Sequence, residues 1–166
     1  LRKLLNNRLA IVGGVIFLII LLACIFAPLL TGYSPKAVDM KSILKPPSGE
    51  HWFGTDKIGR DVFARVLYGG RMSIAIGFGS ALGCAFIGVL LGCYSGYRSG
   101  WFDSLMVRIS EVFMSIPQLI LVMMLVAIMG QSAKNIVIIF IICGWGSCFR
   151  MARSQVLSIR EEEYVQ

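Results

Sequence analysis

Charged residues are scarce in this chain of 166 residues: they make up 15% of the sequence, against 57% hydrophobic residues. They are missing altogether from three stretches, Ile11–Thr31, Met72–Tyr97 and Val112–Ala133. Each stretch is long enough for a helix that crosses the ~30 Å of hydrocarbon in a bilayer, which takes about 20 residues. The scarcity of charge and a mean hydropathy of +0.77 argue against a soluble domain and predict a membrane protein.

The motifs of common catalytic sites are also missing. There is no GxxxxGK[ST] phosphate loop and no HExxH motif, and His51 is the only histidine, in a connecting loop. No CxxC pair occurs among the cysteines, which favours small apolar filling of helices over a disulfide framework or a metal site. The cysteines are Cys24, Cys84, Cys93, Cys143 and Cys148. We therefore expect no enzyme activity in this chain and no metal or cofactor bound to it directly.

The net charge of +7 does not indicate a nucleic-acid partner. The lysines and arginines lie in the gaps between apolar stretches, not along one helical face or among aromatic residues. Cations that flank membrane spans explain this distribution better. We expect lipid to be the main environment and no nucleic acid to be bound.

Four transmembrane helices are predicted, over about 9–30, 72–94, 105–129 and 135–157. The fourth has only fifteen uncharged residues, Asn135–Phe149, so it must run on past Arg150 and Arg153. Pro117 removes a backbone hydrogen bond and should bend the third span. It is a candidate hinge, although most transmembrane prolines are only tolerated kinks.

The second span is rich in glycine, and Gly79/Gly83 and Gly88/Gly92 form two GxxxG pairs. Positions without side chains let a neighbouring helix approach closely, so we expect these four glycines to serve helix packing. In the third span, Arg108 and Glu111 are spaced to pair on one helix face. A salt bridge at the membrane edge is favoured over a role in a polar pathway.

Between the first two spans lies a polar connection of roughly forty residues. Within it, Asp56 could cap a short helix. The apolar residues that follow recur at helical spacing and predict an amphipathic helix over about 57–68, ended by Gly69-Gly70. These apolar residues are Ile58, Val62, Phe63, Val66 and Leu67. Such a helix lies in the membrane interface or packs on the helix bundle, and the pattern does not decide between the two.

Charge does not decide the orientation either. Four spans with the N-terminus inside place eight lysines and arginines on each side. The inside set lies close to the span ends, whereas the outside set sits mostly in the long connection. This difference favours a cytoplasmic N-terminus.

An ordered set of residues follows Trp52-Phe53. It consists of Gly54, Thr55, Asp56, Gly59, Arg60, Asp61, Arg65, Gly70 and Arg71. In order and spacing it resembles the GTDxxGRDVxxR signature of the second permease subunit in ABC importers of the dipeptide, oligopeptide and nickel type. At the other end of the chain, Glu163, Tyr164, Val165 and Gln166 resemble the start of the EAA loop of the same family, which docks on the ATPase.

The resemblance implies an all-α, polytopic helical bundle of the type I ABC importer permease fold. Four of an expected six spans would be present, in a chain truncated at its C-terminus. Residues 1–30 would hold the cytoplasmic N-terminus and the first span, and residues 31–71 an extracytoplasmic connection. Residues 72–166 would hold the permease core and the start of the coupling loop. The location would be the plasma or inner membrane.

The same resemblance implies the partners and the function. The partners would be a homologous permease, two ATPase subunits that hold ATP and Mg²⁺, and an extracytoplasmic substrate-binding protein. The expected function is a permease that forms the pathway for di- or oligopeptides. Nickel or another small solute is the alternative cargo within the family. Outside it, a non-transporting membrane scaffold is the main competitor, and a channel would need a polar stripe along one span that is not found.

Overall fold

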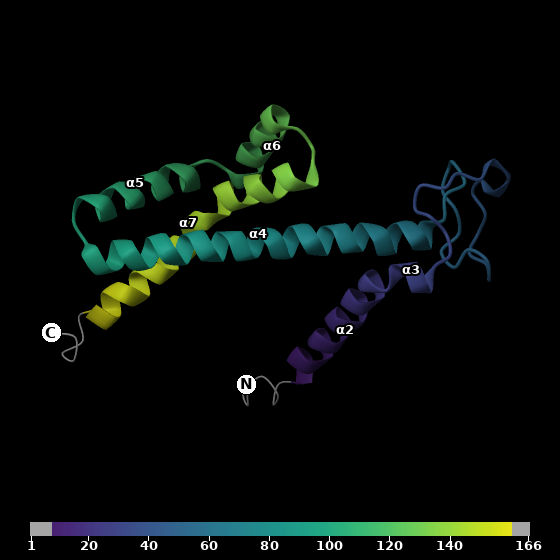
Figure 1. Ribbon diagram of the computed structural model, residues 1–166, viewed down its shortest axis with the longest axis horizontal. Coiled ribbons are helices and arrows are strands. Elements are labelled where there is room, and N and C mark those ends of the chain that lie inside the picture. The colour runs from purple at the N-terminus through teal and green to yellow at the C-terminus, as the bar shows by residue number, and fades with distance from the viewer. Residues whose placement is uncertain (1–7, 161–166) are drawn as a thin grey trace. The chain divides into compact units, whose positions relative to one another are not determined.

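The computed structural model describes residues 8–160, and these residues form helices joined by loops (Figure 1). The elements are α2 (Arg8–Ile25), α3 (Ala27–Leu30), the 3-10 helix η1 (Met40–Ser42), α4 (Val62–Arg98), α5 (Trp101–Ser115), α6 (Gln118–Met129) and α7 (Ala133–Arg160). Within the described residues, β-structure is limited to one isolated bridge between Thr55 and Asp61. The prediction of an all-helical fold is confirmed.

Three helices, α2, α4 and α7, are long and apolar enough to cross a membrane. The pair α5 and α6 passes the same test when taken together, but it is bent by 91° at a short break. The described chain therefore contains three candidate spans, or four if the bent pair counts as one. The fourth predicted span does continue past Arg150 and Arg153, because α7 reaches Arg160.

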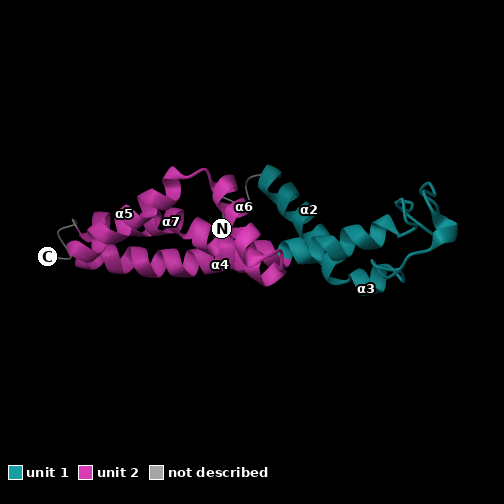
Figure 2. Cartoon of the chain, turned by 90° about the horizontal axis from the view of Figure 1, so that it is seen from above, with its two compact units in different colours: residues 1–74 teal, residues 75–166 magenta. Residues whose placement is uncertain are grey.

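The chain divides into two compact units, Leu1–Ile74 and Ala75–Gln166 (Figure 2). The first unit contains α2, α3, the long connection and the start of α4. Pro28 lies in the first turn of α3, where its missing N–H leaves no helical hydrogen bond unmade. Near the C-terminal end of α2, a Cβ placed on Gly70 of α4 would lie 2.6 Å from Cys24 Sγ, so the two helices are in close contact there.

The predicted amphipathic helix over 57–68 is wrong in its start. Residues 57–61 form a turn, and the helix begins at Val62, where the side chain of Asp61, not of Asp56, accepts the Ala64 N–H at 2.6 Å. Gly59 prevents an earlier start because its φ is +76°, outside the helical region. The buried face also differs: Ala64 is fully buried, whereas Val66 is 53% exposed.

The predicted end of that helix is wrong as well. Gly69-Gly70 lies inside α4, which runs for 37 residues without a break. At 1.5 Å per residue this is ~55 Å of helix, well beyond the ~30 Å of hydrocarbon. The charge-free part begins at Met72, so the first ten residues of α4 extend the membrane helix toward the connection. Each glycine lowers helix stability by about 1 kcal/mol relative to alanine, and two of them are not enough to end a helix of this length.

The second unit is built around the contact of α4 with α7. A Cβ placed on Gly79 would lie against Val137, and one on Gly96 would lie against Val156. The numbers increase together along both helices, so α4 and α7 run parallel. The chain must therefore return between them, and α5 and α6 make that return. The sharp break within the return lies at Ile116, in an extended conformation, and Pro117.

Candidate functional site

The signature residues shape the connection between α3 and α4 through their backbone. Gly54 and Gly59 both have positive φ, +71° and +76°. A Cβ on Gly54 would lie 2.5 Å from the carbonyl oxygen of Lys45, and one on Gly59 would collide with the carbonyl of Asp39. Any other residue at these two positions would strain the backbone and displace the neighbouring loop segment. Both glycines are therefore required by the fold of the connection.

Thr55 ties this stretch to the residues around η1. Its hydroxyl donates to the carbonyl of Ser42 and accepts the Lys45 N–H at 2.8 Å. The Thr55 N–H in turn donates to the Lys45 carbonyl at 3.1 Å. Thr55 is buried, so these bonds are sheltered from water. The result is one folded loop rather than two independent segments.

Asp56 organises the turn that the sequence alone suggested was helical. Its carboxylate accepts the backbone N–H groups of Ile58 and Arg60 and pairs with the side chains of Arg60 at 2.8 Å and Arg65 at 2.6 Å. The hydrogen bond from the Arg60 N–H, followed by those from Ile58 N–H and the Arg60 side chain, holds the pKa of the Asp56 carboxyl well below its ordinary value of 3.8. Arg65 thereby connects the first turns of α4 to the loop.

Asp61 connects the loop to the helix. One carboxylate oxygen caps α4, and the other lies 2.8 Å from His51 Nδ1. Both side chains are buried, and the ring of Tyr33 lies 4.9 Å from the ring of His51. The hydrogen bond between His51 Nδ1 and Asp61 joins the loop to the first turn of α4. No role for His51 follows from the sequence, since its partner is ten residues away and no local motif includes it.

The remaining signature residues, Gly70 and Arg71, lie on α4 beyond this loop. Gly70 faces Cys24, as described above, and Arg71 is exposed at the start of the charge-free part of the helix. A hollow of about 390 Å³ opens in the loop beside His51, Asp61 and Gly59. Its rim carries charges of both signs, from Asp39, Lys41, Lys45 and Glu50. Among the described residues, no group of three or more histidine, cysteine, aspartate or glutamate side chains is arranged to hold a metal ion.

The four glycines expected to serve packing all lie on the face of α4 that meets α7. A Cβ on Gly79 would make ordinary contact with Val137, and one on Gly83 would collide with the flexible end of Ile141. The approach is tighter further along. A Cβ on Gly88 would lie 2.8 Å from the Trp145 carbonyl oxygen, and one on Gly92 would lie 2.5 Å from that of Phe149.

A half-buried ionic cluster at the end of α4 was not predicted from the sequence. Asp103 of α5 accepts two hydrogen bonds from the guanidinium of Arg153 on α7, at 2.5 and 2.6 Å, and a third from the Ser95 hydroxyl. We call Ser95, Asp103 and Arg153 the Asp103 cluster. No sequence pattern predicts a contact between two residues that are 50 positions apart. The only available signal is that all three side chains are polar and lie beside apolar spans. The predicted Arg108–Glu111 pair is confirmed at 3.1 Å, with both side chains exposed.

Two further predictions concern Pro117 and the start of the coupling loop. Pro117 lies at the 91° break between α5 and α6, so the third span is interrupted rather than gently kinked. The expected coupling residues Glu163, Tyr164, Val165 and Gln166 lie outside the described residues. The last described residue of α7, Arg160, precedes Glu163 by three positions.

Comparison with known proteins identifies the chain. A family model for the inner membrane component of binding-protein-dependent transport systems matches residues 88–166. A second, for the N-terminal transmembrane domain of oligopeptide transport permease C, matches residues 1–47. The signature loop around residues 54–61 lies between the two matches. Together they account for both ends of the chain.

Curated relatives extend the similarity over nearly the whole sequence. A dipeptide transport system permease protein from Alkalihalophilus pseudofirmus is 42% identical over 164 residues, which is 99% of this chain and 54% of that protein. An oligopeptide transport system permease protein from Bacillus subtilis is 40% identical over 96% of this chain and 52% of its own length. A probable D,D-dipeptide transport system permease protein from Escherichia coli is 41% identical over 97% and 54%.

The chain spans about half the length of the curated relatives it matches. Within that half, similarity runs through α2, the signature loop, and α4 to α7 alike. The chain belongs to the family of binding-protein-dependent transport permeases, with which its two family matches and these relatives agree.

Proposed function

We propose that this chain is part of a permease subunit of an ATP-driven importer for dipeptides or oligopeptides, and that it is a transport subunit and not an enzyme. The observation that supports this most is the similarity to named peptide permeases over 96–99% of the chain. The apolar helices supply the membrane part that such a subunit needs. None of these three relatives is named as a nickel permease, and a scaffold would not require the signature loop.

The proposed assembly contains this subunit, a homologous permease, two ATPase subunits that bind ATP and Mg²⁺, and a substrate-binding protein. The N-terminus would be cytoplasmic, residues 31–71 extracytoplasmic, and residues 158–166 cytoplasmic. ATP binding would then move the segment that begins at Glu163, and the helices would rock between two packed states. Pro117, at the break between α5 and α6, is the proposed hinge of this motion.

Uptake by the reconstituted complex tests this function. The full-length permease, co-expressed with its partner subunits, is placed in proteoliposomes with ATP inside and binding protein outside. We expect a labelled dipeptide to accumulate with ATP and not with a non-hydrolysable analogue. Accumulation of a nickel chelate and of no peptide would show that the permease transports the alternative cargo, nickel. A permease that purifies without any ATPase subunit would contradict the importer and favour a scaffold.

A further inference from the structure

We propose that the Asp103 cluster and Arg160 are positioning residues for coupling: they fix the end of α7 to the turn between α4 and α5. A displacement of the chain after Arg160 would then move α4 and α5 together with α7. This inference rests on the proposed function, because it assigns a route to the motion that the ATPase would impose.

The first attachment is the pair of Asp103 and Arg153. The guanidinium uses two nitrogens on the two oxygens of one carboxylate, a geometry that fixes direction as well as distance. The side chains are only 13% and 29% exposed, unlike those of the Arg108–Glu111 pair at 81% and 50%. Exposed pairs contribute little to holding elements together, whereas sheltered two-point pairs resist separation.

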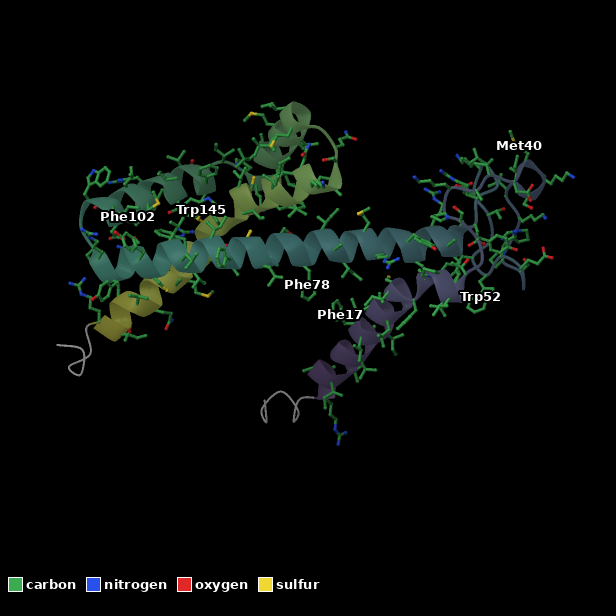
Figure 3. All side chains as sticks on the ribbon, in the orientation of Figure 1. Phe17, Met40, Trp52, Phe78, Phe102 and Trp145 are labelled. Carbon is green, nitrogen blue, oxygen red and sulfur yellow. The ribbon has the colours of Figure 1, made fainter. Side chains whose placement is uncertain are left out.

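Ser95 anchors this pair to α4. It is fully buried, and its hydroxyl donates to the same Asp103 oxygen that accepts from Arg153 Nε. Three helices, α4, α5 and α7, therefore meet at one carboxylate. Figure 3 labels Phe102, the residue that precedes Asp103 near the start of α5. The backbones are close at the same level, because a Cβ on Gly96 would lie 3.1 Å from the Arg153 carbonyl oxygen.

Arg160 supplies the second attachment, seven residues or about two helical turns further along α7. Its guanidinium donates to the Ser99 hydroxyl at 2.7 Å and to the Tyr97 carbonyl at 3.3 Å. Both acceptors belong to the turn that Asp103 follows. The turn itself is constrained, since Ser99 has a φ of +50° and Gly100 one of +92°.

Two attachments on one face of α7 have a mechanical consequence. A single contact would act as a pivot and let the end of the helix swing. With Arg153 and Arg160 both held by residues 95–103, the last turns of α7 cannot swing without breaking one of the contacts. The described end of α7 is therefore tied to residues 95–103 twice, by a sheltered contact at Arg153 and an exposed one at Arg160.

The test measures how many ATP molecules are hydrolysed per peptide imported by the full-length permease in its complex. We expect Arg153→Gln to lower uptake about tenfold while ATP hydrolysis stimulated by loaded binding protein changes much less, so that the ratio rises. The charge exchange Asp103→Arg with Arg153→Asp should bring the ratio back toward wild type. Arg150→Gln is the matched control: Arg150 is exposed, one turn earlier on α7, and makes no hydrogen bond or ion pair with residues 8–160.

The outcomes separate coupling from stability and from the function itself. If Arg153→Gln lowers uptake and hydrolysis in the same proportion as the amount of assembled complex, the cluster only stabilises the fold, and the inference is wrong. An unchanged ratio in fully assembled complex also overturns it. Failure of the wild-type complex to import any peptide would instead contradict the proposed function, independently of the variants.

Discussion

Asp61 is the residue that joins the loop and the membrane helix, since one carboxylate caps α4 and binds His51. The capped N–H belongs to Ala64, the third residue of α4. The other partner, His51, is buried beside Tyr33. Removing the carboxylate leaves a free helix N–H and a buried imidazole without its acceptor. A single side chain thus stabilises two elements at once.

We expect Asp61→Ala to destabilise the protein by about 1–3 kcal/mol, from the lost cap and the unpaired His51. Asp61→Asn should be milder, because asparagine caps helices as well as aspartate and its amide can still meet the ring. Thermal unfolding in detergent and the rate of limited proteolysis within residues 31–61 measure both effects. An equal loss of stability in the two variants would show that the charge of Asp61, and not its helix cap, stabilises the protein.

Asp56 makes the loop sensitive to acid. Its pKa is lowered in the folded loop, chiefly by the Arg60 N–H, so its carboxylate stabilises the loop at any pH above its ordinary pKa of 3.8. That contribution is lost as the pH falls below about 4, through the lowered pKa. We expect amide exchange over residues 54–61 to stay slow from pH 8 to 5, after correction for intrinsic rates, and to accelerate only under stronger acid. Asp56→Asn should exchange faster even at pH 7, and an unchanged rate there would contradict this role.

At the scale of elements, hydrophobic length predicts more than periodicity does. Two of the three charge-free stretches locate α2 and α4, because a run of about 20 apolar residues has few stable alternatives to a membrane helix. The third, Val112–Ala133, falls on the end of α5 and on α6, which are separated by a sharp break. The helical spacing of Ile58 and Val62 misplaces the start of α4, because tertiary contacts of Gly59 and Asp56 decide the turn there. Local patterns cannot show contacts with residues as distant as Asp39 or Ser42.

The glycine face of α4 leads to a prediction with an internal control. Gly88→Ala or Gly92→Ala would push a methyl group into the backbone of α7, at 2.8 and 2.5 Å from carbonyl oxygens. Such overpacking costs about 1–3 kcal/mol. Gly77→Ala, on the same helix, meets nothing within 4 Å and should be neutral or slightly stabilising, since alanine favours helix.

Unfolding midpoints of the three variants in detergent measure this difference. A methyl group that is tolerated equally at Gly77 and Gly92 would mean that α4 and α7 are not in contact along this face. Within each predicted GxxxG pair the two glycines lie on one side of α4, because residues four apart stand one above the other on a helix. Which helix they meet depends on the return of the chain through α5 and α6, and no glycine pattern contains that information.

At the scale of the whole molecule, residues close together in the sequence are enough to recognise the family and the fold class. The contacts between α4, α5 and α7 instead join residues that are far apart in the sequence. The signature occupies residues 54–71, and the apolar stretches are continuous, so both can be recognised along the chain. The Asp103–Arg153 pair spans 50 residues, and the link from Arg160 to Ser99 spans 61. These contacts arise only when α4 and α7 lie parallel, which is a property of the folded unit.

Orientation in the membrane is the remaining property of the whole molecule, and α4 allows it to be tested. Eight cations on either side leave the charge rule balanced, but α4 is ~55 Å long and charge-free from Met72 to Tyr97. Exposed residues before and after this stretch, Lys57 and Ser104, must then lie on opposite sides. In a variant with the five native cysteines replaced, we expect an impermeant maleimide to label Lys57→Cys on intact cells. Ser104→Cys should react only after permeabilisation; the reverse pattern would invert the proposed orientation, and labelling of both on intact cells would show that α4 does not span the membrane.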